Sequence, residues 1–198
     1  PNTALEIESD SLSLFALRLA EREAKEHNYK DIATFTARFR AHIEKMTTQI
    51  EKEAWVPSGF LIETIKTQMD VEEPLTFFEH LHDTGNLIKR NYLVQGKYPR
   101  SYVHRVGEFL LKWLDTAKDV SFTHVLSKYV AKTGLPSARL EVVALDPSKI
   151  TEPVFSSVNC SVTMSGTLEP LESFIKITRL PEATITKVVP SPFPKKHI

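Results

Sequence analysis

An apolar stripe between residues 103 and 114 constrains the fold more than any other feature of the sequence. Six apolar residues recur there at intervals of one, three and four: Val103, Val106, Phe109, Leu110, Trp113 and Leu114. On an α-helix this spacing places all six side chains on one face, so the helix must be buried along one side. With 198 residues, 41% of them apolar, the chain can supply the core that covers this face.

Two further helices are predicted near the start of the chain. Apolar residues at helical spacing run from Leu12 to about His27, after three candidate capping residues at positions 9–11. Asp31 is then expected to cap a longer helix whose stripe reaches Ile50. Because the two stripes are adjacent in sequence, we expect the helices to pack as an antiparallel pair.

Proline and glycine mark the next two helices. The sequence Pro-Ser-Gly at 57–59 interrupts the pattern and opens a shorter helix. Pro74, at a first-turn position, opens another that is predicted to continue towards Tyr92 with a break at Gly85. The first part of the chain is therefore predicted to be mostly helical.

The pattern changes after residue 119. Residues 120–130 and 140–145 are rich in β-branched and aromatic residues, and a turn sequence at 133–136 joins them. This arrangement predicts a β-hairpin. We therefore divide the chain into a helical domain, 1–119, and a second part, 120–198, that begins with the hairpin.

Beyond the hairpin, helices and strands are predicted to alternate. A short helix follows Asp146, a buried strand covers 158–164, a helix covers 168–177 and a further strand covers 183–189. Cys160 is expected to be a small apolar filler on the first of these strands. The predicted fold class is thus α+β: a mostly helical domain with a hairpin, followed by an incomplete α/β portion.

Missing motifs exclude several functions for the chain itself. It contains neither a Gly-x-x-x-x-Gly-Lys-Ser/Thr loop for a nucleotide triphosphate nor a Gly-x-Ser-x-Gly elbow for a serine hydrolase. A single cysteine cannot build an iron–sulfur or thiolate zinc site, and we expect this chain to bind no metal or cofactor. No apolar run approaches the roughly 20 residues of a membrane span. Because the sequence starts at Pro1 without a secretory signal, we expect a piece of a longer cytoplasmic protein.

Charge is balanced overall, at 25 acidic and 25 basic residues, but it is unevenly distributed. Between residues 89 and 112 six basic side chains accompany a single acidic residue, Glu108, and tyrosines lie among them. Such cations neutralise phosphates, and aromatic rings stack on the bases of single-stranded nucleic acid. Six residues are the candidates for DNA binding: Lys89, Arg90, Lys97, Arg100, Tyr102 and Arg105. A basic helix surface whose tyrosines only pack remains the alternative.

Three short blocks follow one another in a characteristic order, at 145–148, 164–171 and 191–194. Their sequences are Leu-Asp-Pro-Ser, Met-Ser-Gly-Thr-Leu-Glu-Pro-Leu and Ser-Pro-Phe-Pro. In order and spacing they resemble XPD-type superfamily-two DNA helicases, between the DEAH box and the start of the second motor domain. By that resemblance, four residues correspond to helicase motif III, which couples nucleotide state to movement on DNA: Ser165, Gly166, Thr167 and Leu168. An ordinary strand-to-helix turn remains the alternative.

The resemblance implies that the helical domain is an arch domain, which helps to close a pore for single-stranded DNA, and that the later α/β portion is RecA-like. The parent would be an ATP-dependent 5′-to-3′ helicase of DNA repair, including nucleotide excision repair, that uses ATP, Mg and an iron–sulfur cluster. Its partners would be single-stranded DNA, the remaining motor and iron–sulfur domains, and repair or transcription-factor proteins.

Catalysis would then belong to the parent, and this chain alone should be inactive. A eukaryotic source would place the parent in the nucleus, although the short helical insertion looks more like the archaeal type. Two other interpretations stay open. One is a helical protein-interaction module without nucleic-acid activity, which docks through the acidic segment 63–83. The other is a segment of a DinG-type helicase.

Overall fold

The computed structural model describes residues 2–131 and 134–190, which fall into two compact units. The larger unit spans Glu6–Leu145, and the smaller one combines Pro1–Leu5 with Asp146–Ile198. The larger unit therefore includes the predicted hairpin and ends beyond residue 119. A division of the family's domains after residue 119 stays a prediction.

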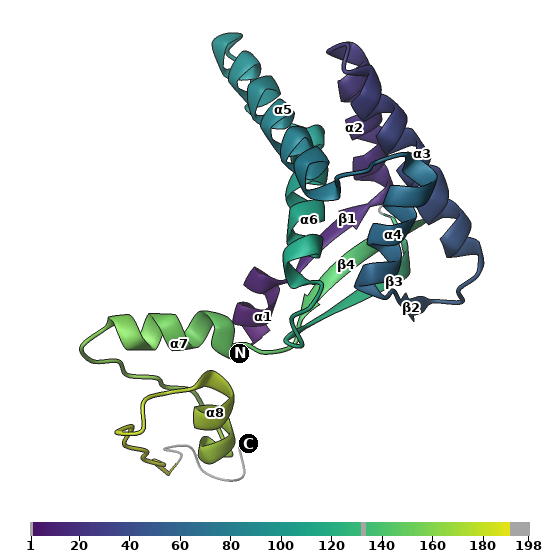
Figure 1. Cartoon of the computed structure of the whole chain (residues 1–198). Helices are drawn as coiled ribbons and strands as arrows, with labels where there is room; N and C mark the ends of the chain where they lie inside the picture. The colour runs from purple at the N-terminus through teal and green to yellow at the C-terminus, as the bar shows by residue number, and fades with distance from the viewer. Residues whose placement is uncertain (1, 132–133, 191–198) are drawn as a thin grey trace. The chain divides into compact units, whose positions relative to one another are not determined.

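The larger unit is built from helices and short strands in mixed order. After α1 (Asn2–Glu8), its elements are β1 (Asp10–Ser13), α2 (Leu14–Glu26), α3 (Lys30–Thr48), β2 (Glu53–Trp55), α4 (Ser58–Met69), α5 (Pro74–Val94), α6 (Tyr102–Thr116), β3 (Phe122–Val130) and β4 (Pro136–Ala144). Helices α2 and α3 form the predicted antiparallel pair (Figure 1). Helices α5 and α6 form a second helical hairpin, which was not predicted. The predicted α+β class is confirmed.

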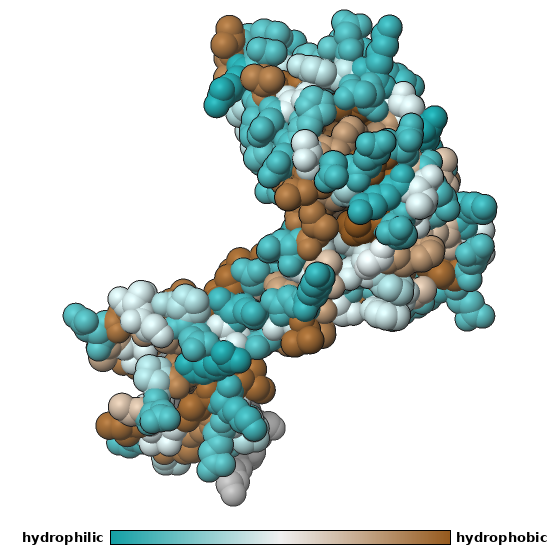
Figure 2. Space-filling view, in the orientation of Figure 1, coloured by the Kyte–Doolittle hydropathy of each residue, from teal (hydrophilic) through white to brown (hydrophobic). Residues whose placement is uncertain are grey.

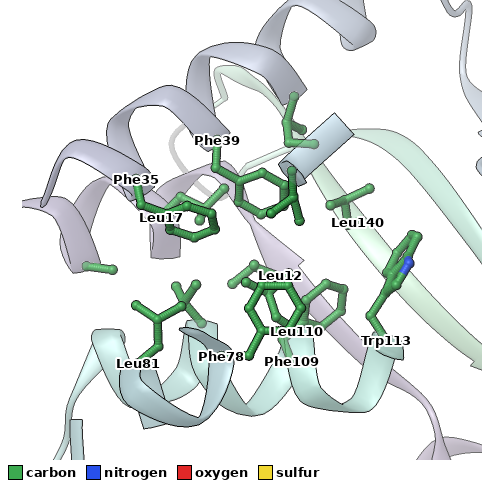
Figure 3. Close-up of a cluster of buried hydrophobic side chains, with 14 of the residues drawn as sticks. Leu12, Leu17, Phe35, Phe39, Phe78, Leu81, Phe109, Leu110, Trp113 and Leu140 are labelled. Atoms are coloured by element: carbon green, nitrogen blue, oxygen red, sulfur yellow. The ribbon is translucent and has the colours of Figure 1, made fainter. Parts of the chain in front are cut away.

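The described strands form one antiparallel sheet in the order β1-β4-β3-β2. Leu12 pairs with Leu140, and Leu140 with Leu126, so one row of leucines crosses three strands on the face that the helices cover. Figure 3 shows Leu12 and Leu140 facing aromatic side chains of the helices. Because side chains alternate along a strand, the neighbouring residues of each strand lie on the opposite face. The predicted β-hairpin is confirmed as β3 and β4.

The apolar stripe of α6 lies in the centre of this core. Its first five members are fully buried, and Leu114 is partly buried against the same cluster. Trp113 packs on the ring of His124, with centroids 4.4 Å apart, and its indole N–H donates to the carbonyl of Ser58 at 3.3 Å. The burial of one side of this helix is confirmed, and the stripe also joins the helices to the sheet.

The N-terminal caps were predicted at the wrong residues. Residues 10–13 form strand β1, and α2 begins after Ser13, whose hydroxyl accepts a hydrogen bond from the N–H of Ala16 at 3.1 Å. Pairing with β4 holds the polar residues of β1 in a strand despite their low strand propensity. Helix α3 begins at Lys30 without a side-chain cap, so Asp31 lies in its first turn.

The break predicted at Gly85 is absent, because α5 is continuous from Pro74 to Val94. Gly85 instead marks a close approach of α5 and α6. A Cβ added there would lie within 3.0 Å of the backbone N and Cα of His104. Gly107 of α6 has the reciprocal role, since its added Cβ would lie 2.5 Å from the N of His82. The two glycines let the helix backbones touch.

The smaller unit contains helices α7 (Ser148–Ser157) and α8 (Leu171–Thr178), close to the two helices predicted there. The strands predicted at 158–164 and 183–189 are wrong: within the described residues both segments are irregular and mostly exposed. An apolar, β-branched run becomes a strand only when a neighbouring strand accepts its backbone hydrogen bonds, and the described part of this unit has none.

Apolar side chains in these two segments are consequently open to solvent. Val162, Met164 and Ile185 are each more than three quarters exposed, and the lower part of Figure 2, which holds α7 and α8, shows hydrophobic surface. Cys160 is also exposed, so its predicted place inside a strand is wrong. None of the described helices has the length and apolar character that a membrane crossing requires.

Candidate nucleic-acid interface

The basic segment lies at the end of the α5–α6 hairpin where the chain turns back. Gly96 has a φ of 70°, and its N–H donates to the carbonyl of Leu93 at 2.9 Å. The N–H of Lys97 donates to the carbonyl of Tyr92 at 2.8 Å. This pair of hydrogen bonds is a Schellman motif, which ends α5 and starts the connection 95–101. The turn places the cations of helix and connection at one end of the hairpin.

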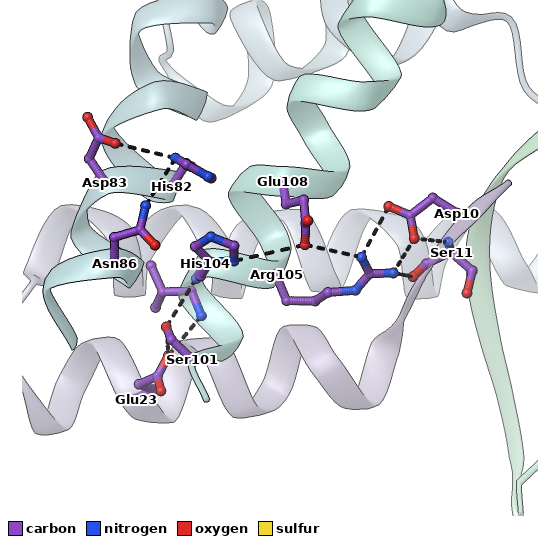
Figure 4. Close-up of polar contacts among 11 residues, drawn as sticks. Asp10, Ser11, Glu23, His82, Asp83, Asn86, Ser101, His104, Arg105 and Glu108 are labelled. Atoms are coloured by element: carbon purple, nitrogen blue, oxygen red, sulfur yellow. Dashed lines mark hydrogen bonds and ion pairs between the residues drawn. The ribbon is translucent and has the colours of Figure 1, made fainter. Parts of the chain in front are cut away.

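The start of α6 is fixed by a buried carboxylate that was not predicted. Glu23 of α2, which is 6% exposed, accepts hydrogen bonds from the Ser101 hydroxyl and the N–H of Val103, both at 2.8 Å (Figure 4). The Ser101 hydroxyl in turn accepts from the N–H of His104 at 3.1 Å. A negative charge at a helix N-terminus is stabilising, so Glu23 anchors this end of α6 to α2.

Three of the predicted cations are open to solvent. Arg90, Lys97 and Arg100 are exposed, and none of them forms an ion pair within 2–131 and 134–190. The Lys97 ammonium lies 5.8 Å from the centre of the Tyr92 ring. The Arg100 guanidinium lies 4.8 Å from the centre of the Tyr102 ring. Lys97 and Arg100 therefore rest against aromatic rings and keep their charge available.

The connection also presents an aromatic side chain that was not among the candidate residues. Tyr98 is 83% exposed and lies between Lys97 and Arg100 in sequence. Tyr102, which was a candidate, is partly buried under Arg100 and packs against the core. The spacing of residues in the sequence does not show which of the two tyrosines is exposed, because their exposure depends on how the connection leaves α5.

Arg105 has a structural role in this fold. Its guanidinium donates to the carboxylate of Asp10, with one of the two contacts at 3.1 Å, and to the carbonyl of Ser11 at 2.7 Å (Figure 4). It also lies 3.5 Å from Glu108. These contacts join α6 to β1, ninety-five positions away in sequence. These contacts leave its guanidinium less available to a phosphate than those of the exposed cations.

Lys89 faces the histidine pair where α5 and α6 cross. The rings of His82 and His104 lie 4.5 Å apart, centre to centre. Burial lowers the pKa of His104, and the charges of Lys89 and His82 add to this effect. Lys89 is partly buried and so is less accessible than Arg90.

The segment that resembles motif III forms an exposed turn in the smaller unit. The Ser165 hydroxyl accepts a hydrogen bond from the N–H of Thr167 at 3.2 Å, and the two hydroxyls lie 3.1 Å apart. Gly166 has open space around its Cα, and Leu168 is partly buried. The turn is a local ST-type arrangement in front of α8. The third block of the resemblance, 191–194, lies outside the described residues, as does the start of the turn at 133–136.

The described residues contain no group of three or more His, Cys, Asp or Glu side chains that could hold a metal ion. The iron–sulfur cluster implied by the resemblance does not fit this chain, since Cys160 is its one cysteine. Any such cluster would be held elsewhere in a longer protein.

Comparison with known families supports the helicase resemblance at a coarse level. Residues 20–190 match the model of the "helical and beta-bridge domain" family, and this range covers most of both units. No curated protein matched the sequence. The chain belongs to the helical and beta-bridge domain family, a domain found in XPD- and DinG-type helicases.

Proposed function

We propose that the chain is the arch-type part of an ATP-dependent 5′-to-3′ DNA helicase of the XPD type, and that the exposed end of its α5–α6 hairpin contacts single-stranded DNA. The observation that carries the proposal is the clustering of Arg90, Lys97, Arg100 and Tyr98 at that end, all exposed. The family match supports the helicase context.

The chemistry of this end suits a single strand. Three exposed cations, which form no ion pair among the described residues, neutralise phosphates without reading sequence, and an exposed tyrosine offers a ring on which a base stacks. Arg105 is left out of the proposed contact because Asp10 and Ser11 already engage it. Lys89 and Tyr102 support the contact from partly buried positions.

The turn at 165–168 would act in the parent as the coupling motif between nucleotide state and movement. Its support is the order of the sequence blocks and the exposure of the Ser165 and Thr167 hydroxyls, which are available to a neighbouring motor domain. Binding of ATP and Mg belongs to other parts of the parent, since the chain has no phosphate loop. A DinG-type parent remains the alternative. Finding a Walker A loop, four cysteines and a DEAH box encoded before Pro1 would support the helicase parent, and their absence would contradict it.

Fluorescence anisotropy with a labelled oligo-dT strand tests the DNA contact. The wild-type chain should bind at low salt, and a variant with Arg90, Lys97 and Arg100 all changed to Gln should lose most of this affinity. A matched control changes three exposed lysines on other parts of the larger unit to Gln: Lys45, Lys66 and Lys118. Equal losses in the two triple variants, or no binding by the wild type, would refute the proposal.

A protein-interaction module is the second candidate, and one feature of the structure favours it. A groove of about 620 Å³ lies among α3, α5 and the α4–α5 connection, with Phe35 and Phe77 among its lining residues. Acidic residues outnumber basic ones in its lining: Asp31, Asp70, Glu72 and Glu73 against Lys30 and Arg38. Such a groove suits a basic segment of another protein. If the chain does not bind DNA, this interpretation takes precedence.

A further inference from the structure

The sheet face that points away from the helices carries an exposed tryptophan. Trp55 lies on β2, at the edge of the described sheet, and is 69% exposed, whereas the other tryptophan, Trp113, is fully buried. Leaving a tryptophan side chain in water forgoes the free energy gained by burying its apolar surface. Tryptophan is enriched where proteins bind partners. Neither the DNA contact nor the motif III resemblance uses this face.

The strand register defines what surrounds Trp55. Trp55 pairs with Val125 of β3, and Val125 pairs with Glu141 of β4, so these three side chains form one row across the face. Adjacent strands lie about 4.8 Å apart, which separates the Trp55 and Glu141 backbones by about 10 Å with Val125 between them. Glu53 lies two residues before Trp55 and therefore on the same face.

A hollow of about 380 Å³ occupies this place. Its lining combines one indole ring, two carboxylates and small or aliphatic side chains: Glu53, Ala54, Trp55, Thr123, Val125, Glu141 and Val143. None of these described lining residues carries a positive charge. Of the two carboxylates, Glu141 is paired with Arg139, whereas Glu53 is exposed and repels phosphate, so a nucleic acid does not suit this face. The complementary ligand is a cation with an apolar or flat body.

The next row of the same sheet face already holds a flat cation, the guanidinium of Arg139. The Arg139 Nε lies 3.1 Å from the Glu141 carboxylate, and its guanidinium lies 5.3 Å from the centre of the Tyr129 ring. Ser127 donates a hydrogen bond to the other oxygen of Glu141. In the row next to that of Trp55, the fold therefore places the Arg139 guanidinium between a carboxylate and an aromatic ring. The hollow offers the same two groups, with Trp55 as the ring and Glu53 as the exposed carboxylate.

We propose that the hollow accepts an arginine side chain of a partner protein. The guanidinium would lie over Val125 against the indole of Trp55 and pair with Glu53, because Glu141 is already engaged by Arg139 and Ser127. Arginine fits better than lysine because its planar head stacks on an indole and is weakly hydrated. This inference is independent of the DNA contact, which uses the α5–α6 end.

Nuclear magnetic resonance on the ¹⁵N-labelled full chain tests the proposal, because the two indole N–H signals report separately on Trp55 and Trp113. The probe is the peptide acetyl-Gly-Arg-Gly-amide, and the control probe has citrulline, the uncharged isostere, in place of arginine. We expect the arginine peptide to shift the Trp55 signal saturably and to leave Trp113 unmoved. The citrulline peptide should have little effect.

Two substitutions make the test specific. Glu53→Gln should weaken binding of the arginine peptide by about two- to fivefold, the range that an exposed ion pair supplies. Glu79→Gln, at an exposed glutamate of α5, should leave it unchanged. The proposal is overturned if both peptides shift Trp55 alike, if the two variants weaken binding equally, or if an oligo-dT strand shifts Trp55 and the arginine peptide does not.

Discussion

Replacing Gly85 by Ala should destabilise the larger unit, although alanine is the better helix former. At an open helical position this change stabilises a protein by about 1 kcal/mol. At Gly85 the new methyl group would lie within 3.0 Å of the backbone of His104, and backbone atoms cannot rotate aside. Overpacking of this kind costs typically about 1–3 kcal/mol, and α5 and α6 must separate to relieve it. Because the approach to the N and Cα of His104 is well inside 3.0 Å, the cost lies in the upper part of that range, at about 2–3 kcal/mol. We expect a net loss of about 1–2 kcal/mol.

Urea denaturation followed by the fluorescence of buried Trp113 measures this loss. With a slope of about 2 kcal/mol per molar urea, the midpoint should fall by about 0.5–1 M. Gly107→Ala should behave similarly, because its methyl group would meet the backbone of His82. Gly59→Ala is the matched control, since an added Cβ there meets nothing within 4 Å. The close approach of the helices is refuted if Gly85→Ala is as stable as the wild type or if it stabilises the protein as Gly59→Ala does.

Three further predictions follow from single contacts. Burial lowers the pKa values of His42, His104 and His124 below the ordinary 6.5, so the unfolded chain binds these protons first. Stability should therefore be constant above about pH 7 and fall as the pH drops through 6.5. Urea midpoints that stay level between about pH 8 and 5 would contradict the burial of these rings. Arg105→Gln should lower the free energy of unfolding by about 1 kcal/mol, because the pair with Asp10 is partly exposed. It should leave DNA affinity unchanged. A loss of affinity without a loss of stability would contradict a structural role for Arg105. Exposed Cys160 should react with a thiol reagent in the native protein as fast as in urea, and protection under native conditions would place it inside a sheet.

The sequence predicted best where one face of an element is buried in the larger unit. The α6 stripe and the β3–β4 hairpin follow from the spacing of apolar residues, since that spacing decides which side chains reach the core. Strands β1 and β2 were missed because they are short, and they exist only by pairing with longer neighbours. The predicted strands at 158–164 and 183–189 failed for the converse reason, because their sequences favour strands but the described unit offers no neighbour to pair with.

The candidate site was predicted in part. Composition identified the basic segment, but it did not distinguish Arg90, which is exposed, from Arg105, which pairs with a residue of β1. It also favoured Tyr102 over Tyr98, whose exposure depends on the turn after Gly96. Contacts between residues ninety positions apart leave no trace in local spacing, and they decided which cations remain available.

The salt dependence of single-strand binding tests the central claim most directly. Three exposed cations that neutralise three phosphates predict a slope of log K against log salt of about −2, at roughly −0.7 per phosphate. Anisotropy titrations with an oligo-dT strand at several salt concentrations give this slope for the wild type and for the variant lacking Arg90, Lys97 and Arg100. We predict that the slope falls close to zero in the variant. A wild-type slope near zero, or a variant that keeps the wild-type slope, would contradict a DNA contact at this end of the hairpin.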